Sequence, residues 1–235
     1  MITTAPLTNV IDVEGLSKTF PGPPLVTALQ PCSFQVRQGE FVAITGPSGS
    51  GKSTLLSLLG LLDKPTAGRY TLDGMDVAGL SDNHRSAVRA HRIGFVFQAF
   101  HLIGYRTVTE NVELGLLYQG TSMRKRRTDA LEVIERVGLI SRKDGLCAHL
   151  SGGEKQRVAI ARTLIRDPAI VLCDEPTGNL DTANGEVILS TLESLIADGM
   201  TVVIISHDPS VAARAPRNLQ IRDGLLTESL VGTSR

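Results

Sequence analysis

Apolar residues fall into alternating stretches and short continuous runs, separated by turns rich in glycine and proline. Residues 11–20 begin with alternating apolar and polar side chains, which predicts a half-buried strand, and residues 26–36 predict a second one after a Pro-Gly-Pro-Pro break. Continuous apolar runs are typical of parallel strands that are buried on both faces. Such runs occupy residues 41–45, 93–97, 170–173 and 201–206.

The pattern changes between residues 98 and 166, where strand signals vanish and helical stretches dominate, most clearly over 108–117 and 128–137. This change predicts a helical insert within an α/β core that has a mainly parallel sheet. Further helices are expected after Lys52, over 86–91, over 184–198 and after the Asp208-Pro209 cap, with a strand over 69–72 and a hairpin over 219–226.

Composition narrows the class of protein. The chain has 235 residues with 24 Lys+Arg and 24 Asp+Glu, a balance that gives no support for binding nucleic acid through bulk charge. The cysteines Cys32, Cys147 and Cys173 have no metal-like spacing, so free thiols in a reducing cytoplasm are expected.

Membrane and targeting signals are weak in the sequence. No apolar run approaches the roughly 18–20 residues that span a bilayer, so work at a membrane requires docking on a protein that spans it. Residues 1–10 read as a loose leader without signal-peptide features. The basic run 124–127 predicts a solvated helix start, with contact to lipid headgroups or a partner as the alternative.

One turn carries specific chemistry. Residues 46–54 lie between the apolar runs 41–45 and 55–59 and match G-x-x-x-x-G-K-[ST], the phosphate-binding P-loop. Its glycines let backbone N–H groups converge on an anion, and the helix that begins there adds the positive end of its dipole. Lys52 can reach the β and γ phosphates of a nucleoside triphosphate, and the Ser53 hydroxyl can bind Mg²⁺. The expected nucleotide contacts are Gly46, Pro47, Ser48, Gly49, Ser50, Gly51, Lys52, Ser53 and Thr54.

Asp174 and Glu175 directly follow the apolar run 170–173. In P-loop enzymes a carboxylate at such a strand end binds the Mg²⁺ shell, and this role is assigned to Asp174. Glu175 is expected to point elsewhere and to act on the attacking water as general base. The alternative is a pair of solvated carboxylates at a strand end.

Ser151 and Glu154 have the spacing of a capping box at the start of a helix. Gly152 and Gly153 leave that helix end open to a phosphate. Because Lys52 already serves the phosphates, and one chain seldom brings two such ends to one nucleotide, a second subunit is expected to supply the second end.

Six motifs in this order resemble the nucleotide-binding subunit of ABC transporters. They are the Walker-type loop 46–54, Gln98, L-S-G-G-E-x-Q-R at 150–157, Asp174-Glu175-Pro176-Thr177-Gly178, Asn179-Leu180-Asp181 and Ser206-His207-Asp208. The resemblance covers about residues 10–228. It implies one ABC ATPase domain over 1–235, with a P-loop NTPase core of 8–98 and 167–228 that includes N-terminal antiparallel strands, and with an inserted helical subdomain at 99–166.

The resemblance also implies a head-to-tail dimer, in which ATP lies between the P-loop of one copy and Ser151, Gly152 and Gly153 of the other. Asp181 would couple the two sites and also cap a helix. Phe20 falls where the family places an aromatic side chain on adenine, with core packing as the alternative.

The catalytic group implied by the resemblance is Glu175, His207 and Gln98. His207 would hold the γ-phosphate and position water near Glu175, and Gln98 would contact both Mg²⁺ and the attacking water. The implied metal contacts are Ser53, Gln98 and Asp174, and the implied cofactors are ATP and Mg²⁺.

Residues 93–98 and 174–181 are most similar to the MacB/LolD/FtsE group, whose ATPases drive membrane subunits by mechanical transmission. This likeness implies a peripheral subunit on the cytoplasmic side of the inner or plasma membrane. Its partners would be a second copy and an integral membrane permease, FtsX/MacB-like, with no nucleic acid. The chain departs from the group's F-N-L-L-P-T-L-T-V run at 100–108, where the partner is expected to dock, and residues 144–149 are also unusual.

Four functions stay open at this point. An exporter-like ATPase leads, followed by an FtsE-like module that regulates a membrane partner without transport. An importer subunit shares all six motifs. A soluble ABC ATPase of DNA repair or translation is disfavoured, because those proteins typically have long inserts or two fused cassettes.

Overall fold

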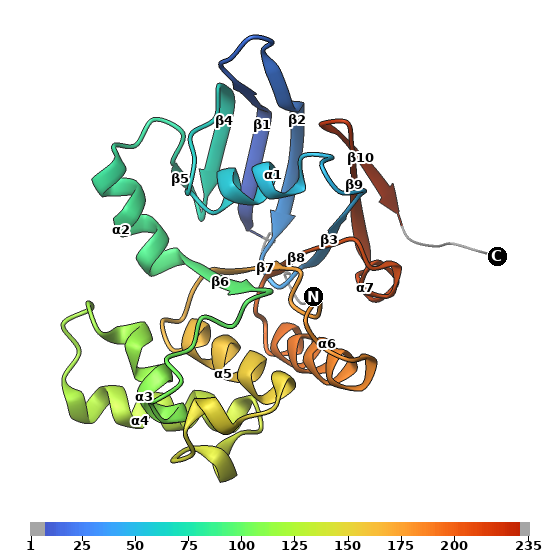
Figure 1. The fold of residues 1–235 in the computed structure, drawn as a ribbon. Coiled ribbons are helices and arrows are strands. Elements are labelled where there is room, and N and C mark those ends of the chain that lie inside the picture. Colours follow the sequence, from blue (N-terminus) through green and yellow to red (C-terminus); the bar gives the residue numbers. More distant parts are fainter. Residues whose placement is uncertain (1–7, 231–235) are drawn as a thin grey trace, which may run out of the picture.

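The computed structural model describes residues 8–230, which form two sheets and the helices around them (Figure 1). The larger sheet has six strands in the order β10-β9-β3-β8-β7-β6. Its strands are β3 (Phe41–Thr45), β6 (Ile93–Phe97), β7 (Ile170–Asp174), β8 (Val202–Ser206), β9 (Arg217–Arg222) and β10 (Leu225–Leu230). All neighbours pair in parallel except β9 and β10, which form an antiparallel hairpin. The predicted α/β class and the closing hairpin are therefore confirmed.

The smaller sheet is antiparallel and has the order β2-β1-β4-β5. It consists of β1 (Asn9–Phe20), β2 (Val26–Arg37), β4 (Ala67–Leu72) and β5 (Met75–Asp76). The predicted N-terminal antiparallel strands are confirmed, with β1 beginning two residues earlier than expected. Of the predicted leader 1–10, residues 1–7 lie outside the described residues.

Seven α-helices are present in residues 8–230. They are α1 (Lys52–Leu59), α2 (Asp82–Arg92), α3 (Val108–Glu113), α4 (Met123–Arg136), α5 (Gly152–Leu164), α6 (Thr182–Ala197) and α7 (Pro209–Arg214). Short 3₁₀ turns lie at Leu114–Leu116, Ile140–Arg142 and Cys147–His149. No helix in this described part combines the length and apolar character that crossing a bilayer requires.

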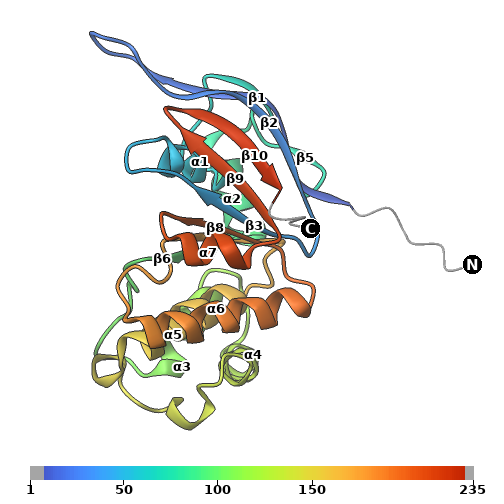
Figure 2. The same ribbon diagram turned by 90° about the vertical axis from the view of Figure 1, so that its right-hand side faces the viewer.

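Strands β3, β6, β7 and β8 are covered on both faces of the sheet, which explains why they are largely apolar, whereas β9 carries polar residues. Along β3, Phe41 and Ala43 join the buried cluster with α3, α4, α5 and α6, whereas Val42 and Ile44 join the cluster with α1 and the antiparallel sheet. Figures 1 and 2 show these two layers above and below β3, β8 and β7. The helices of residues 99–166 share their cluster with the sheet, so their status as a separate subdomain stays a prediction.

Two helices begin earlier than the apolar pattern predicts, because a serine caps each of them. Ser81 accepts a hydrogen bond from the backbone of His84 and starts α2, and Ser122 does the same for α4. The basic run 124–127 therefore lies in the first turns of α4, where Lys125 pairs with Asp129 at 2.9 Å. The predicted helix start is confirmed and its basic residues Arg124, Lys125 and Arg127 are exposed, whereas the alternative of contact with lipid headgroups or a partner stays untested.

The predicted helix over 108–117 is shorter than expected. The α-helix ends at Glu113 and continues as a 3₁₀ turn. Gly115 in this turn lies against α5, where a Cβ atom would come 2.6 Å from the carbonyl oxygen of Arg162. The close approach of the two segments therefore needs a glycine.

Candidate functional site

Four groups of predicted site residues follow four adjacent strands. The P-loop follows β3, His207 follows β8, Asp174 and Glu175 lie at the end of β7, and Gln98 follows β6. The strand ends are level in the sheet, since Thr45 pairs with Ser206 and Asp174 pairs with both Ile205 and Phe97. Because parallel strands present their carboxyl ends at one edge, the topology gathers these motifs from across the chain.

The P-loop is closely packed against backbone, which explains its glycines. A Cβ atom on Gly46 would overlap the carbonyl oxygen of Ile221, and one on Gly51 would overlap that of Ala28. Gly51 also has φ 110°, in the left-handed region. The turn of the β9–β10 hairpin supports the loop from outside, as Gly224 donates its N–H to the carbonyl of Ser50 at 2.8 Å.

The loop has the donors that a phosphate needs. The buried ammonium of Lys52 donates to the carbonyls of Gly46 and Pro47, at 2.7 and 2.8 Å, and one of its three N–H donors is left over from these bonds. Helix α1 begins without a side-chain cap. Ser50 Oγ is buried and lacks a hydrogen-bond partner among residues 8–230. A bound phosphate would satisfy these groups, so the loop fits a nucleotide.

Glu175 is held in a fixed position at the site. Its carboxylate accepts hydrogen bonds from Ser206 Oγ at 3.0 Å and from the backbone N–H of His207 at 3.0 Å, and it lies 2.7 Å from His207 Nδ1. Its backbone has φ 47°, an uncommon conformation for a residue with a side chain. A cavity of about 360 Å³ lies between His207 and the P-loop residues Gly46 and Pro47. His207 therefore lies between this cavity and Glu175, and the joint action of Glu175 and His207 on a water stays a prediction.

Asp174 is half-buried at the end of β7, next to Glu175 in the chain. Burial raises the pKa of the Asp174 carboxyl, the neighbouring charge of Glu175 raises it further, and the Lys52 ammonium acts in the opposite direction. Asp174 thus lies within the electrostatic reach of both the P-loop lysine and Glu175. A half-buried carboxylate beside another carboxylate favours a nearby cation.

Gln98 is fixed by a reciprocal pair of hydrogen bonds. Its Nε2 donates to Asn179 Oδ1 at 3.0 Å, and Asn179 Nδ2 donates to the Gln98 carbonyl at 3.0 Å. A Cβ atom on the preceding Gly178 would come 2.9 Å from Gln98 Nε2. The strand-end glutamine is therefore clamped to the turn that follows Glu175.

The second predicted helix end is built as expected and has an additional role. Ser151 and Glu154 form a complete capping box on α5, and Asp181 caps α6 through the N–H of Asn184. A Cβ atom on Gly153 would overlap Asn184 Oδ1. Gly153 is buried and permits the two helix ends to pack together, and its predicted role of opening the helix end to a phosphate stays a prediction.

Within one chain, the start of α5 is not connected to the P-loop at the start of α1. No hydrogen bond or ion pair within residues 8–230 joins residues 151–153 to residues 46–54. The P-loop contacts β9 and β2, whereas Gly152 and Gly153 contact Leu180 and Asn184.

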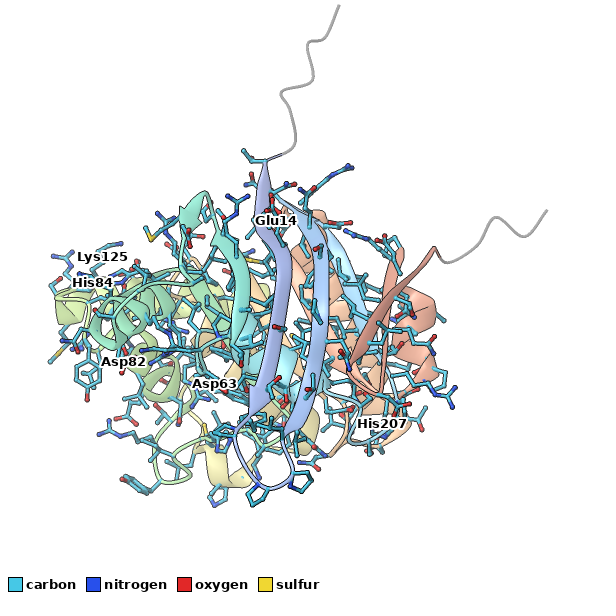
Figure 3. The ribbon with its side chains drawn as sticks, turned by 90° about the horizontal axis from the view of Figure 1, so that it is seen from above. Glu14, Asp63, Asp82, His84, Lys125 and His207 are labelled. Carbon is cyan, nitrogen blue, oxygen red and sulfur yellow. The ribbon has the colours of Figure 1, made fainter. Side chains whose placement is uncertain are left out.

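Phe20 ends β1 and is 40% exposed as a residue, so the structure excludes core packing as its role. The Lys18 ammonium lies 4.9 Å from the ring centroid and is held by Asp63 and by the Lys64 carbonyl, both at 2.7 Å. Figure 3 shows Asp63 and His207 on either side of the β1–β2 hairpin. The stacking of adenine on Phe20 stays a prediction.

Three residues that contact the site were not predicted to act in it. Ser206 holds Glu175, Asn179 holds Gln98, and the fully buried Gln156 donates to the carbonyls of Phe97 and Pro176 at 3.1 and 2.8 Å. Each is a polar residue inside or beside a motif, and this position in the sequence could have indicated that it contacts the site.

Comparison with known proteins identifies a family model and several relatives that resemble this chain. The family model described as ABC transporter matches residues 29–178. The uncharacterized ABC transporter ATP-binding protein YvrO of Bacillus subtilis is 46% identical, over 92% of this chain and 95% of its own length. The macrolide export ATP-binding/permease protein MacB 1/2 of Paracoccus denitrificans is 45% identical over 94% of this chain, which spans only 33% of that protein.

A solved structure has the same fold. The dimeric ATP-binding cassette MJ0796 in a post-hydrolysis state with ADP and Pi superposes with a TM-score of 0.83 at 40% identity. The match covers 94% of this chain and 99% of that one.

Proposed function

From the premise that this chain belongs to the ABC transporter family and is one of its ATPase cassettes, we propose that two copies bind two ATP molecules head to tail. The P-loop of one copy and the Ser151–Gly153 helix end of the other enclose each nucleotide. Binding closes the dimer, and hydrolysis opens it. The observation that carries the proposal is the gathering of Lys52, Glu175 and His207 at one sheet edge while the second helix end lies on a separate element.

The proposed chemistry uses the groups at this edge. Lys52 and the P-loop N–H groups bind the β and γ phosphates. Glu175 takes a proton from the attacking water, and His207 holds the γ-phosphate and the water in line. Asp181, which caps α6 next to Gly153, relays changes between the two sites.

The metal in this proposal is Mg²⁺. Within residues 8–230 there is no cluster of three or more His, Cys, Asp or Glu side chains that could hold a metal. A set made of the Ser53 hydroxyl, Asp174 and Gln98, completed by phosphate oxygens, matches the way in which proteins bind Mg²⁺ with nucleotides. When bound, Mg²⁺ neutralises charge on the β and γ phosphates.

Substitution of Asp174 by Asn is expected to raise the Mg²⁺ concentration for half-maximal ATP turnover by about 10–100-fold. The variant keeps the shape of the side chain and removes the charge that favours a cation. The measurement is steady-state turnover over a Mg²⁺ titration, with EDTA as the zero point. Asp198→Asn, at the end of α6, is the matched control. An unchanged Mg²⁺ requirement in Asp174→Asn would remove Asp174 from the metal site.

Substitution of Phe20 by Ala is expected to weaken ATP binding by about 2–10-fold, because a stacked aromatic pair contributes about 0.5–1.5 kcal/mol. The exposed ring and the lysine beneath it support this role. Titration calorimetry with ATP measures the effect. Tyr105→Ala is the control, since Tyr105 is 81% exposed on a different loop. Equal affinities of Phe20→Ala and the unmodified protein would contradict adenine stacking at this position.

The proposed partner is an FtsX/MacB-like integral membrane permease, with the cassette peripheral on the cytoplasmic side of the membrane. The macrolide export relatives, whose names join an ATP-binding part to a permease, support an export or mechanical transmission role. Residues 99–166 form the helical subdomain that passes dimer movement to this partner.

A pull-down from membranes tests the partner. The Glu175→Gln form is used with Mg²⁺ and ATP, and the co-purifying protein is identified by mass spectrometry. A permease with a large extracytoplasmic domain supports the proposal. A multi-span permease with a binding protein would replace it by import, and the absence of any membrane protein would favour a soluble role.

A further inference from the structure

Two segments that depart from the family pattern lie side by side. The loop after Gln98 and the segment that leads to Ser151 are joined by backbone hydrogen bonds. Cys147 donates to the Arg106 carbonyl and Ala148 to the Gly104 carbonyl, both at 3.0 Å. Thr107 and Leu146 form an antiparallel bridge. The two segments, 103–109 and 143–148, are here called the paired loops.

Asn111 of α3 is the central side chain between the paired loops, and it is completely buried. Its Oδ1 accepts from the backbone N–H of Ile103 at 2.8 Å. Its Nδ2 lies 3.0 Å from the carbonyls of both Ile103 and Thr107, and 3.1 Å from Cys147 Sγ. Only a side-chain amide offers an acceptor and two donors in this shape, so Asn111 satisfies buried backbone on one loop and contacts the other.

The chain just before the first of the paired loops is fixed to α5. Arg162 of α5 donates to the carbonyls of His101 and Phe100 at 2.6 and 3.0 Å. At the other end of α5, a single residue, Leu150, separates the 3₁₀ turn Cys147–His149 from the Ser151 cap. The segment after Gln98 is thus bound near one end of α5, and the segment before Ser151 leads into the other end. Asn111 lies between the two paired loops.

We infer that Asn111 is a positioning residue that fixes the Ser151–Gly153 helix end relative to the loop after Gln98. Through the paired loops it holds the Ser151 cap where a second copy of the chain can receive it. Asn111 touches no nucleotide in this arrangement. Its loss leaves the P-loop intact and makes ATP-dependent dimer formation weaker. This inference rests on the proposed head-to-tail dimer.

Asn111→Ala tests the inference in two measurements. By hydrogen exchange on the monomer, the amides of residues 145–148 are expected to exchange at least about tenfold faster, while those of 46–54 are unchanged. In the Glu175→Gln background, the ATP concentration for half-maximal dimerisation is expected to rise at least about tenfold, with ADP affinity of the monomer unchanged. A general loss of folding would instead lower both nucleotide binding and dimerisation.

Two further variants keep the test decisive. Thr109→Val removes the hydrogen bond of Oγ1 to the Lys143 carbonyl at 2.9 Å without changing side-chain shape, and a smaller effect in the same direction is expected. Tyr70→Phe removes a buried hydrogen bond to the Leu59 carbonyl in the other core cluster, and dimerisation is expected to stay unchanged.

Failure of the proposed dimer and failure of the role given to Asn111 lead to different results in these measurements. If Glu175→Gln alone stays monomeric with ATP, the proposed dimer is contradicted, and the exchange measurement still decides whether Asn111 holds the paired loops. If Glu175→Gln dimerises and Asn111→Ala changes neither dimerisation nor exchange at 145–148, the inference is overturned.

Discussion

Substitution of Glu175 by Gln is expected to lower ATP turnover by about 10²-fold or more, as for loss of a general base. Glutamine has the size of glutamate but cannot take a proton from water. Ser206 and His207 hold the side chain in place, so the variant keeps the geometry while it loses the chemistry. ATP then binds and stays unhydrolysed, and the closed dimer accumulates. Steady-state phosphate release and the ATP content of the isolated dimer measure both effects.

The matched control is Glu193→Gln on α6, which removes a carboxylate paired with Arg214 at 3.1 Å, away from the sheet edge. Its turnover is expected to stay within about twofold of the unmodified protein, as for surface substitutions in general. Normal hydrolysis by Glu175→Gln would show that another group activates water, and the role given to Glu175 would be wrong.

Substitution of Ser151 by Arg is expected to abolish ATP-dependent dimerisation and to lower turnover by about 10²-fold or more. In the proposed dimer this helix end donates hydrogen bonds to a phosphate, and the loss of such a donor to a developing negative charge has an effect of this size on catalysis. Ser151 is exposed at the start of α5, so a long side chain there blocks the approach of a second copy. Nucleotide binding by the P-loop of the monomer is expected to stay intact. Light scattering with ATP and titration with ADP separate the two effects.

Ser122→Arg provides the same substitution at another exposed helix cap. Ser122 caps α4 as Ser151 caps α5, and both lose a side-chain cap on substitution. Only the Ser151 variant is expected to lose dimerisation. Equal behaviour of the two variants would mean that the Ser151 helix end does not contact the nucleotide of a second copy.

The strands and the P-loop could be predicted because their signals are local. Each buried parallel strand is a continuous apolar run, and the motif at 46–54 has its strand and helix directly beside it. The early starts of α2 and α4 could not be predicted from apolar periodicity, because Ser81 and Ser122 begin turns whose faces are polar.

Contacts between residues that are far apart in the chain could not be predicted from the sequence. Asn179 clamps Gln98 across 81 residues, and Gln156 reaches the carbonyl of Phe97 across 59. The glycine at 153 was predicted to bare a helix end, but its packing against Asn184 depends on how α5 and α6 meet. Sequence spacing identifies the groups of such a site, whereas the side chains that hold them depend on the packed fold.

The central claim is that two copies complete each ATP site, and it can be tested directly by the molar mass of Glu175→Gln in solution with Mg²⁺ and ATP. The chain mass is 25.1 kDa. The account predicts a particle of twice that mass with one ATP per chain, which reverts to the single chain when Ser151→Arg is added. A particle of single-chain mass with ATP fully bound, in a protein whose unmodified form hydrolyses ATP, would contradict it.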